Sequence, residues 1–219
     1  VSDGTNTTTE AIVVNVTNVN DNSPVLSVAT PYSVAEGTTA VGTVTTTDAD
    51  AGTTTLTYSL TGTDADDFTI TKTGAAQNGV IAFSSAPDFE TKTAYSLNVV
   101  VSDGTNTTTE AIVVNVTNIN DNNPVFTSSA SESINEGQTS VSTVEAGDAD
   151  GNTIAYSIDS TGREDHALFT INSSTGALTM TARDFENPTD DHGTDDDNVY
   201  GVTAVSYTHL RAHETTRPR

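Results

Sequence analysis

Residues 101–124 read VSDGTNTTTEAIVVNVTNINDNNP, and residues 1–24 read VSDGTNTTTEAIVVNVTNVNDNSP. The two stretches differ only at Val19/Ile119 and Ser23/Asn123. Self-similarity of this kind indicates tandem copies of one structural unit. Asp103-Gly104 in this stretch lies between two alternating apolar runs, at 95–101 and 112–116, which predicts a β-hairpin.

Shorter matches extend the repeat along the chain. They pair Glu36 with Glu136, Asp48 and Asp50 with Asp148 and Asp150, Phe68 with Phe169, Asp88 and Glu90 with Asp184 and Glu186, and Tyr95 with Tyr200. We therefore expect the end of one unit at 1–24, a complete unit at 25–124, and a third unit at 125–204 that stops before its last strand. Residues 205–219 depart from the pattern and are expected to be a non-native tail.

The complete unit contains about seven strand candidates with period-2 alternation and no sustained helical periodicity. They lie at 32–36, 39–47, 54–60, 67–71, 79–84, 93–102 and 108–117. Tyr95, Leu97, Val99 and Val101, for example, alternate with residues on the opposite face. An all-β sandwich is the expected fold.

The composition narrows the class of partner. With 30 acidic residues against 7 basic ones, the net charge is −23. Nucleic acid is not an expected partner, because phosphate binding needs clustered Lys and Arg. There is no Cys, which excludes disulfides and thiolate metal sites. The sequence has no run of 18 apolar residues, so none of it is expected to insert into a membrane.

The acidic motifs recur in a fixed order within each unit: Glu-Gly, Asp-x-Asp, Asp-x-Glu, Val-x-x-Asp-Gly, and then Asn-x-Asn-Asp-Asn-x-Pro. This order resembles the cadherin repeat over residues 1 to about 204. The resemblance implies tandem seven-stranded Greek-key sandwiches, immunoglobulin-like in architecture, with Ca²⁺ bound where successive repeats meet. Calcium takes 6–8 oxygen ligands, which suits clustered Asp, Glu and Asn side chains.

The resemblance also implies which residues hold the metal. At the junction of the second and third units they are Glu36, Asp88, Glu90, Asn120, Asp121, Asn122, Asp148 and Asp150. The corresponding residues of the other junctions are Asn20, Asp21, Asn22, Asp48, Asp50, Asp103, Glu136, Asp184 and Glu186. Without cations, the gathered carboxylates would repel one another and push the units apart.

Each motif also has a structural interpretation that needs no metal. Asp48, Asp50 and Asp103 lie where Asp side chains stabilise turns. The linkers before Pro24 and Pro124 are also compatible with plain spacers. The segment Asp64-Ala-Asp66-Asp67 and the stretch 187–198 are expected to be solvated loops. The family usually has an acidic residue where Asn18 and Asn118 stand, and this departure predicts a lowered affinity.

Three classes of function are compatible with these observations. We expect non-enzymatic, calcium-binding repeats of an extracellular or cell-surface stalk used in cell adhesion, whose partners are neighbouring repeats and another surface protein or glycan. The near-identical, Cys-free units are similar to those of large bacterial surface adhesins. A carbohydrate-binding or other surface-ligand module, or non-catalytic repeats appended to a secreted hydrolase, are the alternatives.

Overall fold

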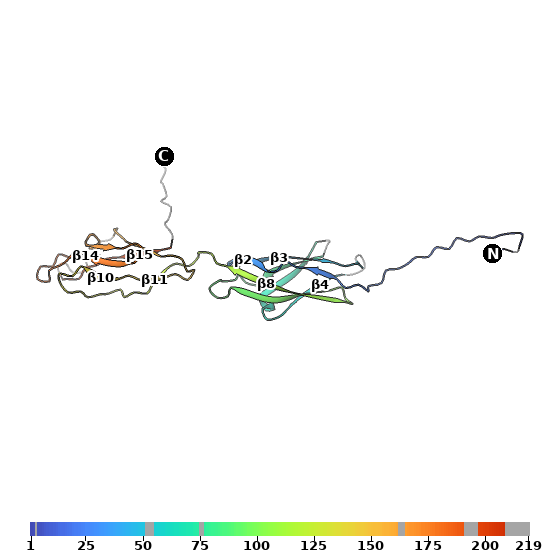
Figure 1. The fold of residues 1–219 in the computed structure, drawn as a ribbon, viewed down its shortest axis with the longest axis horizontal. Coiled ribbons are helices and arrows are strands. Elements are labelled where there is room, and N and C mark those ends of the chain that lie inside the picture. The colour runs from blue at the N-terminus through green and yellow to red at the C-terminus, as the bar shows by residue number, and fades with distance from the viewer. Residues whose placement is uncertain (3, 51–54, 75–76, 162–164, 191–196, 209–219) are drawn as a thin grey trace, which may run out of the picture. The chain divides into compact units, whose positions relative to one another are not determined.

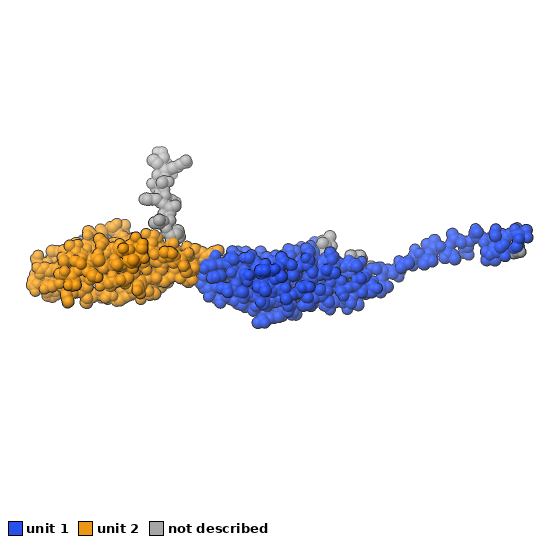
Figure 2. Space-filling model, viewed as in Figure 1, with its two compact units in different colours: residues 1–118 blue, residues 119–219 orange. Residues whose placement is uncertain are grey.

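The computed structural model describes residues 1–2, 4–50, 55–74, 77–161, 165–190 and 197–208. The chain divides into two compact units, residues 1–118 and 119–219, which are coloured separately in Figure 2. Each unit is a β-structure. The helices of the described parts are two single-turn 3-10 segments, η1 (Ala65–Asp67) and η2 (His166–Leu168).

The first unit contains a sandwich of two four-stranded sheets (Figure 1). One sheet has the order β1 (Val25–Ser27), β3 (Ala40–Thr47), β6 (Asn78–Phe83) and β5 (Phe68–Thr73). The other has the order β2 (Tyr32–Ala35), β8 (Thr107–Thr117), β7 (Ala94–Ser102) and β4 (Thr57–Thr61). Only β2 and β8 pair in parallel. The predicted all-β sandwich is therefore confirmed.

The core lies between these two sheets and follows from the alternation of the strands. In β7, Tyr95, Leu97, Val99 and Val101 are buried, as the period-2 pattern predicts. Tyr95 meets Phe68 and Phe83 edge-on, with ring centroids 5.5 and 5.0 Å apart. Such geometry is favourable for aromatic pairs.

The seven predicted strands are all present, with small shifts at their ends. The strand missed is β1, whose three residues are too few to show alternation. Together β1 and β2 form a first strand that changes sheets, because β1 pairs with β3 whereas β2 pairs with β8. Residue 54, the first of the predicted strand 54–60, lies outside the described residues.

Residues 1–24 behave differently from their copy at 101–124. Val1 and Thr8 exchange backbone hydrogen bonds, so the tip of the predicted hairpin is retained. From Thr9 to Asn20, the segment forms no strand and is exposed almost throughout. Figure 1 shows it as an extended trace leaving the sandwich at the end where β1 begins.

The second unit repeats part of this plan with shorter strands. A three-stranded sheet has the order β10 (Ser140–Thr143), β14 (Ala177–Met180) and β13 (Phe169–Ile171). Two-stranded pairs join β11 (Ala146–Gly147) to β9 (Val125–Phe126) and β12 (Ala155–Ile158) to β15 (Ala204–Tyr207). Its buried cluster is small, with Phe169, Leu178 and Met180 at its centre.

The first residues of the expected non-native tail form part of a strand. Residues 205–207 belong to β15, where Val205 pairs with Ser157 and Tyr207 with Ala155. The strand continues because β12 offers a complete backbone ladder as far as Ala155, and that ladder does not depend on side-chain identity. Residues 209–219 lie outside the described residues, so the rest of that prediction is not addressed.

No helix in the parts of the chain that the structure describes has the length and apolar character needed to cross a membrane.

Candidate metal centre

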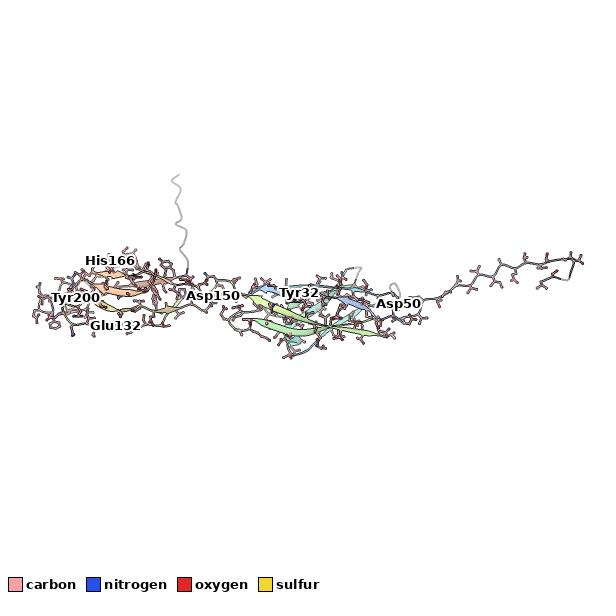
Figure 3. The ribbon with its side chains drawn as sticks, in the orientation of Figure 1. Tyr32, Asp50, Glu132, Asp150, His166 and Tyr200 are labelled. Carbon is pink, nitrogen blue, oxygen red and sulfur yellow. The ribbon has the colours of Figure 1, made fainter. Side chains whose placement is uncertain are left out.

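The end of the first sandwich nearest residues 20–24 is organised around Asp50. Its carboxylate accepts hydrogen bonds from the backbone N–H groups of Asn22, at 2.8 Å, and Asp21, at 3.1 Å. These bonds hold the pKa of Asp50 below its usual range, the Asn22 N–H contributing most. Asp50 therefore fixes the preceding linker against the sandwich, at the position labelled in Figure 3.

Two buried oxygens at this end have no hydrogen-bond partner among the described residues. They are Oδ1 of Asn20 and Oδ2 of Asp48. The other Asp48 oxygen accepts the backbone N–H of Asp50 at 2.8 Å. Buried polar atoms are normally satisfied, so an unpartnered pair of acceptors suits a cation.

Asp103 has the turn role that its Asp-Gly setting predicted. Its Oδ1 accepts the backbone N–H groups of Asn106 at 2.6 Å and Thr105 at 2.7 Å, which lowers its pKa. The side-chain amide of Asn20 donates to the Asp103 carbonyl at 3.4 Å. The hairpin tip and the linker are thereby joined, with the Asp103 carboxylate 6% exposed beside them.

The second unit repeats this arrangement with its own residues. Asp150 accepts the backbone N–H and the side-chain amide of Asn122, both at 2.8 Å. Carboxylate oxygens of Asp121 and Asp150 lie within 4.8 Å of each other. Within the described parts of the chain, Oδ2 of Asp148 is buried without a hydrogen-bond partner, as is its counterpart in Asp48. Asn120 instead donates to the Thr208 hydroxyl at 3.3 Å and is exposed.

At the opposite end of the first sandwich, Glu36 and the segment 88–90 come together. Glu36 is only 4% exposed and accepts the backbone N–H of Phe89 at 2.8 Å. Asp88 accepts the Thr91 hydroxyl at 2.8 Å, and this bond is the main reason its pKa is lowered. Carboxylate oxygens of Glu36 and Glu90 lie within 4.8 Å of each other.

The same end of the second unit gathers its own three carboxylates. Glu136, Asp184 and Glu186 place one oxygen each within 4.8 Å of the others. Glu136 accepts the Phe185 N–H at 3.2 Å, as Glu36 accepts that of Phe89. All three are exposed, whereas Glu36, the counterpart of Glu136, is buried in the first unit. Of the predicted ligands, Glu36 with Glu90 in the first unit, and Asp121 with Asp150 and Glu136 with Asp184 and Glu186 in the second, thus bring carboxylate oxygens together.

Asp64 was expected to be a solvated loop residue, and this was wrong. Its carboxylate accepts Lys92 Nζ at 2.7 Å and the Ser96 backbone N–H at 2.7 Å. Lys92 is the largest cause of the lowered Asp64 pKa. Little in the sequence indicated this ion pair, because the two residues are 28 positions apart.

Part of the acidic stretch 187–198 was also assigned wrongly. Asp190 is 6% exposed and accepts the backbone N–H groups of Asp197 and Asn198 at 3.3 and 2.9 Å. It therefore closes this loop from inside rather than facing water. Residues 191–196 of the same stretch lie outside the described residues.

A family comparison agrees with this geometry. Residues 30–117 match the model of the Cadherin domain. The chain belongs to the cadherin repeat family. The cadherin domain covers β2 to β8 of the first unit, so it includes Glu36, Asp48, Asp50, Asp88 and Glu90.

Curated relatives extend the likeness to both units. Protocadherin-15 of Mus musculus is 35% identical over 191 residues, covering 81% of this chain and 9% of the relative. Cadherin EGF LAG seven-pass G-type receptor 2 of Homo sapiens is 33% identical over 194 residues, covering 83% of this chain and 6% of the relative. The chain thus spans less than a tenth of the length of either.

Solved structures give the same result. Human protocadherin-24 EC1-2 is 26% identical with a TM-score of 0.58, covering 80% of this chain and 90% of that one. A protocadherin gammaB7 EC3-6 cis-dimer structure is 25% identical with a TM-score of 0.61, covering 77% of this chain and 43% of that one. The solved structures thus agree with the sequence relatives in placing this chain among cadherin repeats.

Proposed function

We propose that this chain binds Ca²⁺ at the ends of its cadherin repeats and acts as part of an extracellular adhesion stalk. The observation that carries the proposal is the set of buried, unpartnered oxygens on Asn20, Asp48 and Asp148. Each lies next to an Asp whose carboxylate is already hydrogen-bonded to the linker, namely Asp50 or Asp150.

The donor set fits calcium. Calcium prefers carboxylate and amide oxygens, and it accepts the irregular geometry of a loop-based site. A buried oxygen without a donor costs roughly 1–3 kcal/mol, so a cation that coordinates it removes a penalty. The bound ion would also offset repulsion among neighbouring carboxylates. Asp48, Asp50 and Asn20 would hold it in the first unit, and Asp148, Asp150 and Asn122 in the second.

Consecutive repeats are joined by a short linker, and this connection favours calcium ions that residues of both repeats bind. The backbone N–H of Glu36 donates to the carbonyl of Thr117, the last residue of β8, so the Glu36 cluster lies where the first sandwich ends. The second begins at β9 with Val125. Between them lies the short linker 118–124, whose Asn122 is bonded to Asp150. We infer that Glu36, Glu90 and Asp121 act on the same ions as Asp150.

A calcium-dependent joint suits a surface stalk. Extracellular calcium modules bind with dissociation constants of roughly 10⁻⁴ to 10⁻³ M, so such joints are filled outside the cell and empty in the cytosol. Repeats that contact only their neighbours form extended arrays. On this basis we place the chain at the cell surface or outside the cell, with neighbouring repeats as its first partners and another surface protein as its adhesion partner.

Small-angle scattering with and without calcium tests the joint. We expect millimolar calcium to extend the chain, and Asp121→Ala to reduce that change while each sandwich stays folded. Asp66→Asn is the matched control, because Asp66 is an exposed acid in η1 and belongs to neither group of gathered carboxylates. A scattering profile that is indifferent to calcium would leave the proposed joint without a mechanism.

A further inference from the structure

A three-residue pattern that recurs in this chain is the acceptor signal for N-linked glycosylation. The pattern is Asn-x-Ser or Asn-x-Thr, in which x is any residue other than Pro. It occurs at Asn6, Asn15, Asn106, Asn115 and Asn172. The pattern alone does not select a site, because the folded chain must also leave room for a sugar at the Asn side chain. The structure distinguishes the last three positions from one another.

Transfer of the sugar uses the side-chain amide nitrogen of Asn. This nitrogen attacks the first carbon of an oligosaccharide that is carried on a lipid pyrophosphate. The nitrogen–carbon bond forms, the bond from that carbon to the pyrophosphate oxygen breaks, the amide loses one proton, and the lipid pyrophosphate leaves. One of the two Nδ2 hydrogens is thereby replaced by the sugar. An acceptor Asn therefore needs an exposed Nδ2 whose hydrogens the fold does not use.

Asn115 meets this requirement in the first sandwich. It is exposed in β8, on the opposite face of the strand from the buried Val114 and Val116. Its partners on the adjoining strands are Ala94 of β7 and Ser33 of β2, and both are exposed. Neither of these short side chains is long enough to cover the Asn115 carboxamide. A sugar on Asn115 therefore extends into solvent.

The surroundings of Asn115 suit a neutral oligosaccharide. Among the described residues, no hydrogen bond holds the Asn115 side chain. The strands β2, β7 and β4, which form one sheet with β8, contain no charged residue, although the chain has a net charge of −23. A glycan on this face of the sheet consequently displaces neither a hydrogen bond of its own Asn nor an ion pair of these strands.

Asn172 meets the same requirement in the second unit. Residues 172–175 connect β13 to β14 and are all exposed. Oδ1 of Asn172 accepts the backbone N–H groups of Ser174 and Thr175, both at 3.0 Å. These bonds fix the amide through its oxygen. Within the described parts of the chain, no hydrogen bond uses the Asn172 nitrogen, so Nδ2 is free to carry a sugar.

Asn106 has the pattern, but the fold uses its amide nitrogen. Nδ2 donates to the carbonyl of Asn22 at 3.1 Å and to the Asp103 carboxylate at 3.5 Å. The first bond holds the linker residue whose own N–H is bonded to Asp50. A glycan would replace one of the two hydrogens and would put a bulky group against the linker. The structure of the first unit is therefore incompatible with a glycan at Asn106.

We propose that Asn115 and Asn172 carry N-linked oligosaccharides and that Asn106 does not. This assignment rests on the extracellular location in the proposed function, because the oligosaccharide is attached to chains that enter the secretory route. It does not depend on calcium binding. N-linked glycans are bulky and solubilising. The glycan on Asn115 covers part of the outer face of the sheet that contains β8.

Peptide mapping of the secreted 219-residue chain tests the proposal. The chain is secreted from mammalian cells by means of an added signal peptide, and its folded form is isolated by gel filtration. A protease that cleaves after Glu places each acceptor on a fragment of its own. These fragments are 1–10 with Asn6, 11–36 with Asn15, 91–110 with Asn106, 111–132 with Asn115, and 165–186 with Asn172.

Peptide N-glycosidase then converts every glycosylated Asn to Asp, which mass spectrometry detects. We expect this conversion at Asn115 and at Asn172, and we expect Asn106 to stay unmodified. Identical residues at 11–17 and 111–117 cause no ambiguity, because the two fragments differ in length and in their remaining sequence.

Two substitutions of Thr117 are matched controls. Thr117→Ala removes the third residue of the pattern but keeps Asn115, so fragment 111–132 should lose its glycan. Thr117→Ser keeps the hydroxyl and should keep the glycan. Thr117 is exposed and its hydroxyl lies 3.4 Å from the Val34 carbonyl, so neither change should unfold the sandwich. Asn115→Gln should give the same loss with Thr117 in place.

Three results would overturn the proposal. They are an unmodified Asn115 or Asn172 in the folded, secreted chain, a glycan on Asn106 at the same occupancy as on Asn115, and a glycan on fragment 111–132 that persists in Thr117→Ala. Calorimetric titration of calcium into the same sample separates this outcome from that of the proposed function. Glycans without calcium binding support the two glycan sites and contradict the calcium function, whereas calcium binding by an unmodified chain does the reverse.

Discussion

The Asp50 carboxylate accepts the backbone N–H of Asn22 at 2.8 Å, and Asp150 accepts that of Asn122 at the same distance. In both units, the second Asp of the Asp-x-Asp motif therefore holds a linker residue that lies 28 positions before it in the sequence. The bond is charge-assisted, which makes it stronger than a neutral one. It keeps the linker ordered next to the proposed metal ligands.

Asp50→Ala should release that linker. We expect hydrogen exchange at the Asn22 N–H to accelerate on the order of tenfold, since a charge-assisted bond is lost. Asp48→Ala is the control, because the Asp48 carboxylate bonds the N–H of Asp50 and not that of Asn22. Both variants are compared in chelator, so that metal binding does not contribute. Equal acceleration in the two would show that Asp50 has no special role.

Two isoleucines with the same neighbours in sequence should respond differently to truncation. Ile112→Ala removes a side chain that is 1% exposed and should lower the free energy of unfolding by about 2–5 kcal/mol. Ile12→Ala should change it by less than about 0.5 kcal/mol, because Ile12 is 83% exposed. Urea unfolding at low protein concentration makes the comparison. Similar losses would mean that the N-terminal copy is packed in solution.

Gly176 is held by close backbone contact as well as by its conformation. It has φ of +70°, and a Cβ there would overlap the carbonyl oxygen of Val144. Gly151 has φ of +73° with nothing within 4 Å of an added Cβ. Gly176→Ala should therefore destabilise the second sandwich by about 1–3 kcal/mol more than Gly151→Ala. Amide exchange in β14 measures this, and exchange in β7 should be unchanged.

The Lys92–Asp64 pair should contribute a small, pH-dependent stabilisation. Asp64→Asn keeps an acceptor for the Ser96 N–H but removes the charge, so we expect a loss of about 1 kcal/mol at pH 7. Asp67→Asn should cost less, because Asp67 lies 3.5 Å from Lys92 and is 52% exposed. Urea unfolding of both variants makes the comparison.

The direction of the pH effect follows from the lowered Asp64 pKa. The stabilisation is complete above the unfolded-state pKa of about 3.9 and is lost as pH falls through the lower folded-state pKa. The difference between wild type and Asp64→Asn should thus be constant from pH 7 to about 5 and vanish in stronger acid. A difference that grew on acidification would contradict the assignment.

The alternation of apolar and polar residues along the sequence was sufficient to predict most of the strands. Strands such as β7 and β8 are long enough for period-2 alternation to identify their buried face. The sequence could not show that β1 pairs with β3, because three residues carry no periodicity. It also did not show that Val205 to Tyr207 extend β15, because that ladder is made by the backbone of β12.

The metal ligands were predictable in kind but not in detail. Recurrence of the acidic motifs indicated that Asp48 and Asp50 act together, and they do lie together. Their different roles depend on three-dimensional contacts: Asp50 bonds the linker, whereas one Asp48 oxygen is buried and unpartnered. The Asp64–Lys92 pair forms only when η1 meets the end of the loop before β7, so spacing alone did not reveal it.

Isothermal titration calorimetry of calcium into the chelator-treated chain tests the central claim most directly. We predict binding with dissociation constants of roughly 10⁻⁴ to 10⁻³ M. Asp48→Asn and Asp148→Asn should each weaken or remove a site, while the exposed-loop control Asp66→Asn should bind as wild type does. If calcium releases or absorbs no heat in this range, or if Asp48→Asn and Asp66→Asn bind alike, the unpartnered oxygens are not metal ligands and the account is contradicted.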